Sequence, residues 1–397
     1  MRGPPSTVLR RVPAPPDPGG DAPALPAHVD VAIIGGGVIG LSIGWRLLAA
    51  GLSVAILDRG AIGGGASLAA TGMLAAAAEF EPGAEQHLDF ARDSQRLWPG
   101  FAARLEAESG LSVDYRSDGV LIVAQSRDEV ERLRFRHRLQ LAAGLPTRWL
   151  AGAECRALEP ALRPAITAGV FCPDDHQVDP PRVVAALVEA VRRRGGHILP
   201  FCAAEPAIAG EAVEGVETPQ GLLRAGTVIA AGGAWTRLPE ETLPLRPLRG
   251  QSLALAMEPG RPLLGRMVWT DEVHLAPKGD GTLVVGATME ERGFDDAVTA
   301  GGLFALLDGV RRVLPGAEEL SVEAVWSGFR PTSVDDAPIL GTTETRGLLV
   351  ATGHHRNGYL LAPATAMAMA ALVLNGTIGE PAAPFATGRF RKQEHAA

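Results

Sequence analysis

The segment from residue 30 to residue 58 limits the possible folds more than any other part of the chain. It opens with an apolar, β-branched run at residues 31–34, typical of a strand buried on both faces of a parallel sheet. Gly35, Gly37 and Gly40 follow in the pattern G-x-G-x-x-G, and a helical stretch comes after them. A second apolar strand then ends at Asp58, 18 residues after Gly40. This order predicts the first βαβ unit of a doubly wound sheet.

Each part of this segment has a mechanical role in binding a dinucleotide. The first glycine permits a tight turn, the second lets the backbone approach a pyrophosphate, and the third lets the helix pack closely on the strand. The helix N-terminus offers free N–H groups to phosphates, and Asp58 can accept bonds from ribose hydroxyls. A glycine-rich turn without a nucleotide is the alternative, since glycine makes up 48 of 397 residues. The strand, helix and acid around the turn favour a nucleotide, without choosing between NAD and FAD.

Composition narrows the class of protein. A net charge of −8 and a pI near 5.7 argue against a nucleic-acid partner, which would need a basic face. The three cysteines form no C-x-x-C pair, and the nine histidines form no H-E-x-x-H motif. We therefore expect no metal site, and we expect a reducing, cytoplasmic location.

Neither end of the chain predicts a targeting segment or a membrane span. The first 28 residues contain eight prolines and no apolar core of a signal peptide, so we predict a disordered tail. The apolar stretch at residues 361–374 contains Pro363 and is shorter than the ~20 residues that a membrane span needs. We interpret it as a buried helix.

The remaining patterns predict two domains. A second strand running into a glycine turn, at residues 227–235, indicates a nucleotide domain assembled from separated segments. Strands predicted at residues 248–256, 272–276 and 282–288, the last two as a hairpin, indicate a second sheet. The predicted fold class is therefore α/β: a Rossmann-like dinucleotide-binding domain plus a substrate domain with a mostly antiparallel sheet. The first domain, which the resemblance given below makes an FAD-binding domain, is predicted to span 29–85, 170–245 and 326–380, and the substrate domain 86–169 and 246–325.

A charged helix is predicted at residues 127–143. Its arginines resemble a basic patch, but Glu131 stands three residues before Arg134, at ion-pair spacing on a helix. We expect a solvated face rather than a binding surface.

Four segments in this order resemble the FAD-dependent family of D-amino acid oxidases, sarcosine oxidases and glycine oxidases. They are the turn at residues 35–40 with Asp58, the small-residue loop at 66–74, the turn at 230–235, and Arg330 with residues 353–363. The resemblance covers about residues 30 to 380. Residues 326–331 and 353–358 look most like the glycine oxidase branch that serves thiamine biosynthesis.

The resemblance implies which residues contact FAD. Asp58, Arg59, Val38 and Ile39 would hold the pyrophosphate and ribose, and Ala204 or Glu205 would meet the adenine. The other implied contacts are Gly35, Gly37, Gly40, Ala66, Ser67, Thr71, Gly72, Met73, His354, His355, Arg356, Asn357, Gly358, Tyr359 and Leu360. No cysteine follows Cys202, so we expect the FAD to be non-covalent, unlike in monomeric sarcosine oxidases.

The resemblance also implies a substrate site. Arg330 would bind the substrate carboxylate, with Arg356 as a second catalytic residue and with His274 and Met289 lining the pocket. An ion pair between Arg330 and Asp335 or Asp336 is the alternative. Glycine oxidases often carry a tyrosine where His274 stands, so the choice of substrate stays open. A general-base role for His354 or His355 is the less favoured interpretation, because a hydrogen-bonded structural histidine is commoner.

The implied activity is oxidation of a small amino acid, most of all glycine, by oxygen. The products would be an imine, then glyoxylate and ammonia, and hydrogen peroxide. A D-amino acid or sarcosine oxidase, or a dehydrogenase with another electron acceptor, is the alternative on the same scaffold. An NAD-dependent dehydrogenase and a non-catalytic flavin-binding subunit are more distant alternatives. The resemblance further implies a homo-oligomer.

Overall fold

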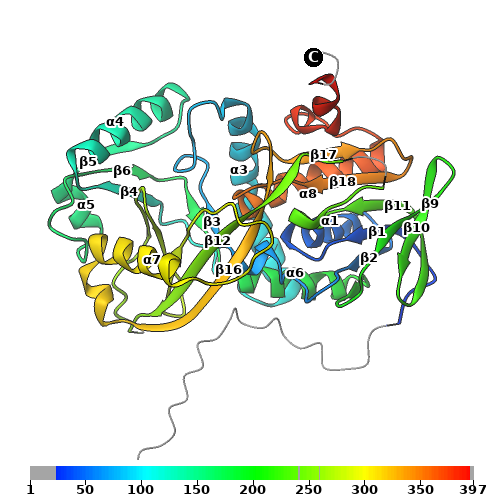
Figure 1. Cartoon of the computed structure of the whole chain (residues 1–397), viewed down its shortest axis with the longest axis horizontal. Helices are drawn as coiled ribbons and strands as arrows, with labels where there is room; N and C mark the ends of the chain where they lie inside the picture. The colour runs from blue at the N-terminus through cyan, green and yellow to red at the C-terminus, as the bar shows by residue number, and fades with distance from the viewer. Residues whose placement is uncertain (1–23, 240–241, 259, 394–397) are drawn as a thin grey trace, which may run out of the picture.

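The computed structural model describes residues 24–239, 242–258 and 260–393, so the predicted tail lies outside the described residues as far as residue 23. Two eight-stranded sheets lie side by side, each with its own helices (Figure 1). β3 (Met73–Leu74) and β7 (His176–Gln177) form a third, two-stranded sheet that pairs with neither of the other two. The predicted fold class is confirmed.

The first sheet collects strands from distant parts of the chain, and five of them are parallel. Its order is β17 (Ile339–Thr342), β18 (Leu348–Thr352), β11 (Gly221–Ala230), β1 (His28–Ile34), β2 (Val54–Leu57) and β8 (His197–Leu199). Antiparallel β10 (Ala212–Thr218) and β9 (Glu205–Ala209) extend β11. The predicted strands at 31–34, 54–57 and 227–230 therefore meet in one sheet.

Both faces of the parallel strands are covered, which explains their continuous apolar sequence. Val31 and Ile33 belong to the core beneath the helices, whereas Ala32 belongs to the core on the side of β9 and β10. The covering helices are α1 (Val38–Ala49), α3 (Glu85–Ser109), α6 (Pro180–Arg193) and α8 (Gly358–Asn375).

Helix α8 includes the long apolar stretch seen in the sequence. By length and composition it is the one helix within the described ranges that is long and apolar enough to cross a membrane. However, 61% of it is buried in this fold, where it packs against α1 and α3. The prediction of a buried helix is confirmed.

The second sheet is antiparallel except where β13 pairs with β4. Its order is β16 (Ser321–Ser333), β12 (Leu245–Ala256), β15 (Thr282–Gly286), β14 (His274–Pro277), β13 (Met267–Trp269), β4 (Val120–Ala124), β6 (Ala168–Cys172) and β5 (Arg148–Ala151). The predicted hairpin is present as β14 and β15. Helices α4 (Arg127–Ala142), α5 (Gly152–Leu158) and α7 (Ala300–Val313) accompany this sheet.

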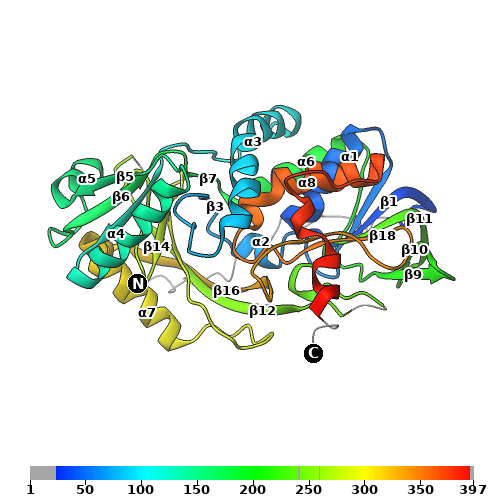
Figure 2. The same ribbon diagram turned by 90° about the horizontal axis from the view of Figure 1, so that it is seen from above.

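Strands β12 and β16 form a long antiparallel ribbon that extends from the second sheet toward the first (Figure 1, Figure 2). The pairing divides the chain differently from the predicted domain boundaries at three places. Helix α3, predicted in the substrate domain, packs on α8 beside the first sheet. Strand β6 crosses the predicted boundary at residue 170. Strand β16 continues past the predicted boundary at residue 326 while it stays in the second sheet. The third difference arises because β16 stays paired with β12 along its full length, which the local pattern does not reveal.

Candidate functional site: a cavity between the two sheets

The glycine turn lies at the carboxyl ends of the parallel strands, where open α/β sheets bind ligands. Gly35 has a φ of +120°, and a Cβ there would lie 2.3 Å from the Ala231 carbonyl oxygen. A Cβ on Gly40 would lie 2.0 Å from the Gly35 carbonyl oxygen, so Gly40 permits the close packing of α1. Gly37 starts α1 without a side-chain cap. The turn therefore leaves space for a phosphate group beside the N-terminus of α1, as a dinucleotide requires.

Asp58 and Arg59 extend the turn toward the second glycine segment. The Asp58 carboxylate accepts hydrogen bonds from the Gly36 N–H at 2.8 Å and the Gly60 N–H at 2.9 Å. It therefore fixes both adjoining loops and keeps unused lone pairs for a hydroxyl donor. The Arg59 guanidinium lies 4.3 Å from the centre of the Trp235 ring.

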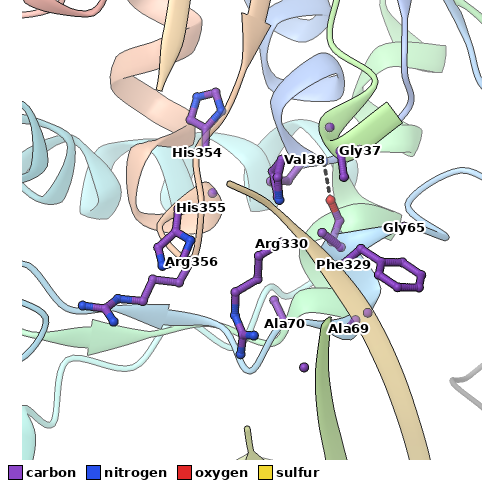
Figure 3. Close-up of a pocket in the computed structure, with 18 of the residues that line it drawn as sticks. Gly37, Val38, Gly65, Ala69, Ala70, Phe329, Arg330, His354, His355 and Arg356 are labelled. Atoms are coloured by element: carbon purple, nitrogen blue, oxygen red, sulfur yellow. Dashed lines mark hydrogen bonds between the residues drawn. The ribbon is translucent and has the colours of Figure 1, made fainter. Parts of the chain in front are cut away.

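The small-residue loop forms a close-fitting wall of the cavity. Helix α2 (Ala66–Ala69) carries Ser67, whose Oγ accepts a 2.9 Å bond from the Val38 N–H (Figure 3). A Cβ on Gly72 would lie 2.1 Å from the Val178 carbonyl oxygen. Small side chains and exposed backbone in this wall are what a flat ring system needs to lie against.

Lys278, a buried residue behind this wall, was not predicted from the sequence as part of the site. Its Nζ donates to the Thr71 carbonyl at 2.7 Å and to the Val178 carbonyl at 2.8 Å. Burial lowers its pKa to about 8, although Asp179 partly opposes that shift. No local spacing marks this lysine, because its acceptors lie about 100 and 207 residues away.

One cavity of about 1560 Å³ brings together most of the predicted residues. It is larger than the ~300–1,000 Å³ usual for a small-molecule pocket, as a dinucleotide plus a substrate would require. The predicted residues that line it are Gly35, Gly37, Val38, Ile39, Asp58, Arg59, Ala66, Ser67, Thr71, Gly72, Met73, Ala204, Glu205, His274, Met289, Arg330, His354, His355, Arg356, Gly358 and Tyr359.

Three predicted cofactor residues, Gly40, Asn357 and Leu360, do not line the cavity. Gly40 packs against the turn, and Leu360 is buried in the core. Asn357 is the N-cap of α8. They shape the backbone around the cavity rather than its surface.

Arg330 extends from β16 into the cavity (Figure 3). Its Nη1 donates to the Thr288 carbonyl at 3.1 Å and to the Arg249 carbonyl at 3.5 Å. Within the described residues, Nη2 and Nε have no acceptor and the side chain forms no ion pair. Burial lowers its pKa, with Glu79 opposing and Arg356 reinforcing the shift.

The alternative ion pair between Arg330 and Asp335 or Asp336 is wrong. Asp335 instead pairs with Arg389 at 2.8 Å. Asp335 also accepts from the Ala337 N–H, so it caps a turn at Asp336, whose φ is +55°. A half-buried arginine without an acidic partner among the described residues is an unsatisfied site for an anion, and its free edge suits a carboxylate.

Arg356 has a different environment and points away from Arg330 (Figure 3). It forms ion pairs with Glu79 and, at 2.9 Å, with Glu81. The Glu79 side chain is only 6% exposed, and its charge is the main reason that the pKa of Arg356 is raised. The chain therefore already neutralises Arg356, and its predicted catalytic role stays a prediction.

The histidines of the cavity are uncharged at neutral pH. Burial lowers the pKa of His274 to about 3, and Arg330 adds to that effect. Burial likewise lowers the pKa of His354 and of His355 to about 3. His354 bonds to Thr365 at 3.0 Å and His355 to Thr332 at 3.0 Å, so both have structural partners. Met289 lines the cavity with 59% of its surface exposed.

The cavity also receives residues from α4, where a solvated face was expected. Arg134 does pair with Glu131 on the surface, but Arg136 lines the cavity and donates to the Ala78 carbonyl. Its guanidinium lies 5.4 Å from the centre of the Trp269 ring. The helical spacing gave the correct surface pair and could not show which arginine faces inward.

The three cysteines, Cys155, Cys172 and Cys202, are all buried and none of them lines the cavity. A thioether link between a cysteine and a flavin in this cavity is therefore not available. This agrees with the expectation of non-covalent FAD.

Comparisons with known proteins agree with this geometry. A model of the DAO family, described as FAD dependent oxidoreductase, matches residues 30–372. The chain is 34% identical to glycine oxidase of Geobacillus kaustophilus, over 91% of this chain and 97% of that protein. It is 33% identical to a bifunctional ThiO/ThiG protein of Trichormus variabilis, over 92% of this chain and 55% of that protein.

The crystal structure of the Geobacillus kaustophilus glycine oxidase superposes with a TM-score of 0.85 at 33% identity, covering 91% of this chain and 98% of that one. Glycine oxidase from Bacillus cereus superposes with a TM-score of 0.82 at 32% identity, covering 88% and 96%. The glycine turn, the wall of small residues and the arginine without an acidic partner among the described residues are thus found in a chain that belongs to the DAO family of FAD-dependent oxidoreductases.

Proposed function

We propose that this enzyme oxidises glycine, with water and oxygen as co-reactants and glyoxylate, ammonia and hydrogen peroxide as products. The observation that carries the proposal is Arg330, which is half-buried in the cavity wall and has no acidic partner among the described residues. Nη1 of Arg330 is occupied by two carbonyls, so Nη2 and Nε form the edge that would receive the substrate carboxylate. Such a two-point contact fixes the orientation of the substrate as well as its position.

Neighbouring residues would leave this contact undisturbed. His274 and His355 are neutral, so they add no charge that would repel the substrate amine. The amine must lose one ammonium proton before oxidation, because the nitrogen lone pair forms the C=N bond. Bound FAD supplies the two-electron oxidation, and the chain supplies orientation and electrostatics.

The cofactor contacts form part of the same proposal. Asp58 and the backbone at Val38 and Ile39 would hold the ribose and pyrophosphate, since these groups line the cavity next to the glycine turn. Thr71 to Met73 would lie along the ring system, on backbone held by Lys278. His354 and its neighbours would close the opposite side.

Sarcosine and small D-amino acids are the second candidate substrates, and His274 favours them. Glycine oxidases often have a tyrosine at this position, and a histidine ring leaves more space. Met289 also lines the cavity and is half-exposed, and its flexible side chain can adapt to an added methyl group on the substrate.

Anaerobic addition of glycine to the purified yellow protein tests the proposal. We expect the visible flavin absorbance to bleach, to return on admission of oxygen, and to yield stoichiometric glyoxylate and hydrogen peroxide. Parallel samples with sarcosine, D-alanine and L-alanine rank the substrates. Glycine that leaves the spectrum unchanged would refute the assignment, and bleaching that oxygen cannot reverse would indicate a different electron acceptor.

We also propose a role in thiamine biosynthesis, supported by the similarity to a ThiO/ThiG protein. Expression of this chain should restore growth without thiamine to a bacterial strain that lacks its own glycine oxidase. An Arg330→Ala variant should fail to do so.

A further inference from the structure

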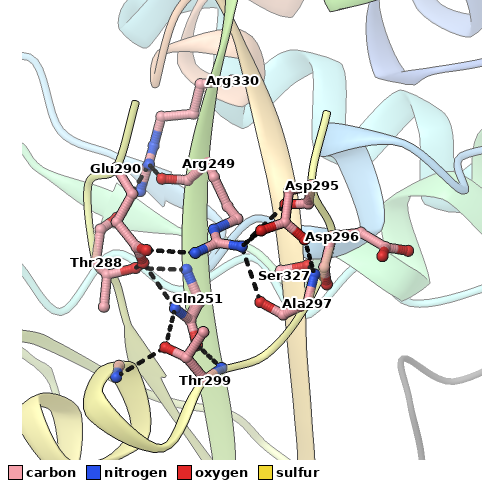
Figure 4. Close-up of polar contacts among 11 residues, drawn as sticks. Arg249, Gln251, Thr288, Glu290, Asp295, Asp296, Ala297, Thr299, Ser327 and Arg330 are labelled. Atoms are coloured by element: carbon pink, nitrogen blue, oxygen red, sulfur yellow. Dashed lines mark hydrogen bonds and ion pairs between the residues drawn. The ribbon is translucent and has the colours of Figure 1, made fainter. Parts of the chain in front are cut away.

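A polar network behind Arg330 fixes the backbone that orients this side chain (Figure 4). Both acceptors of Arg330 Nη1 are main-chain carbonyls, of Thr288 and of Arg249. The edge of the guanidinium that faces the cavity is therefore decided by where these two carbonyls lie.

Arg249 ties β12 to the segment at residues 288–299. Its side chain is buried, and Nη1 donates to the Asp295 carbonyl at 3.0 Å, the Asp295 carboxylate at 2.9 Å and the Ala297 carbonyl at 3.0 Å. Nη2 donates to Glu290 Oε2 at 2.5 Å. The main chains of Arg249 and Glu290 also exchange two hydrogen bonds, at 3.0 and 2.9 Å.

Glu290 connects this pair to Thr288. Its Oε1 accepts from the Thr288 hydroxyl at 2.6 Å and from Gln251 Nε2 at 2.7 Å. The Thr288 hydroxyl in turn accepts from the Gln251 N–H at 2.9 Å. These bonds hold the residue whose carbonyl is the nearer acceptor of Arg330.

Gly250 provides the space in which Arg330 lies against β12. A Cβ at Gly250 would lie 2.5 Å from Arg330 Nη1, 2.7 Å from Nη2 and 2.8 Å from Cζ. Alanine would therefore displace the guanidinium itself.

We propose that Arg249, Glu290 and Gly250 are positioning residues that select the edge of Arg330 presented to the substrate carboxylate. This inference rests on the proposed function, because it assumes that Arg330 binds that group. None of the three needs to touch the substrate. Arg249 and Glu290 act through the two carbonyls that accept from Arg330, and Gly250 acts through the space that it leaves for the guanidinium. Their loss should weaken carboxylate binding much more than it slows the oxidation of bound substrate.

The test measures the dissociation constant of acetate, which has the carboxylate but cannot be oxidised as an amine, by the change that it causes in the flavin spectrum. It also measures KM and kcat for glycine in the FAD-loaded enzyme. Glu290→Gln should raise the acetate dissociation constant and KM about tenfold, in the range of one misaligned charged hydrogen bond, with kcat within about twofold. Gly250→Ala should have a larger effect, about 30-fold or more, because it moves the guanidinium directly.

Glu291→Gln is the matched control, since Glu291 is the next residue and its one ion pair within the described part of the chain is an exposed pair with Arg246. It should leave both constants unchanged. Equal constants in Glu290→Gln and Glu291→Gln, or a fall in kcat at unchanged acetate affinity, would overturn the inference.

Arg330→Lys separates this inference from the proposed function. Weaker acetate binding in Arg330→Lys but not in Glu290→Gln or Gly250→Ala would reject the positioning role alone. Acetate affinity that is unchanged in Arg330→Lys would reject the anchor, and with it the proposed function.

Discussion

Two arginines on neighbouring strands, the buried Arg249 and the half-buried Arg330, have opposite electrostatic environments. In the β12–β16 ladder, Arg249 is paired with Phe329, the residue before Arg330. Arg249 has Glu290 at 2.5 Å and Asp295 at 2.9 Å, whereas Arg330 has only main-chain carbonyls among the described residues. A largely desolvated cation without a counter-charge is costly, so the second environment is the one that we expect a ligand to complete. This difference is why we propose Arg330, and not Arg249, as the ligand-binding arginine.

The largest expected effect comes from Arg330→Ala. Removing one partner of a desolvated pair costs about 3–5 kcal/mol, which corresponds to an increase in KM of roughly 100- to 4,000-fold for the amino acid. FAD should remain bound, as judged by the ratio of visible to ultraviolet absorbance after gel filtration. A KM close to that of the unaltered enzyme would remove Arg330 from the site and reduce the comparison to two structural arginines.

The nucleotide half of the cavity was predictable because its determinants are local. Gly35, Gly37 and Asp58 lie within one βαβ unit, and the need for a positive φ at Gly35 follows from a turn of a few residues. The strands at 31–34 and 54–57 were predicted for the same reason, since burial on both faces leaves a continuous apolar run.

The substrate half was less predictable because its contacts join distant residues. The carbonyl acceptors of Arg330 are 42 and 81 residues away, and Arg356 reaches Glu81 across 275 residues. Lys278 and Arg136 likewise depend on partners brought together by the pairing of the sheets. Arg330 itself came from the family resemblance, and sequence spacing could not show that it is unpaired while Arg249 is not.

The second prediction concerns stability and contrasts the same two positions. Arg249→Met should lower the free energy of unfolding by about 3 kcal/mol, because it leaves Glu290 without its main partner in a largely buried network. Arg330→Met should be neutral or stabilising in the absence of substrate, since it removes a half-buried charge that has no acidic partner among the described residues. Denaturant unfolding of the FAD-loaded proteins measures both, and a double Arg249→Met, Glu290→Leu variant should recover part of the loss. Equal stability of the two single variants would contradict the distinction.

Arg356 offers an intermediate case that sharpens the comparison. It lines the cavity like Arg330 but is paired like Arg249, with Glu79 and Glu81. Arg356→Gln should therefore cost about 2 kcal/mol of stability by leaving the buried Glu79 unpaired, and should raise KM by less than tenfold. Adding Glu79→Gln to this variant should restore stability. A KM increase as large as that of Arg330→Ala would instead establish Arg356 as a second anchor.

The smallest expected effect is a pH dependence of stability, which we expect for Glu290 in the Arg249 network and not for Arg330. Burial would raise the pKa of Glu290, but hydrogen bonds from Arg249, Thr288 and Gln251 outweigh it and lower the pKa from 4.5 to about 2. A carboxylate with a depressed pKa stabilises the fold above its unfolded pKa and loses that contribution as the pH falls toward its folded pKa. The stability gap between the unaltered protein and Glu290→Gln should thus be constant above pH 5 and should shrink between about pH 4.5 and pH 2. Denaturant unfolding at pH 6, 4 and 3 measures the gap, and a gap independent of pH over this range would show that the Glu290 charge does not hold Arg249. Arg330 has no carboxylate of its own, so the corresponding gap for Arg330→Met should lack this acid-dependent change.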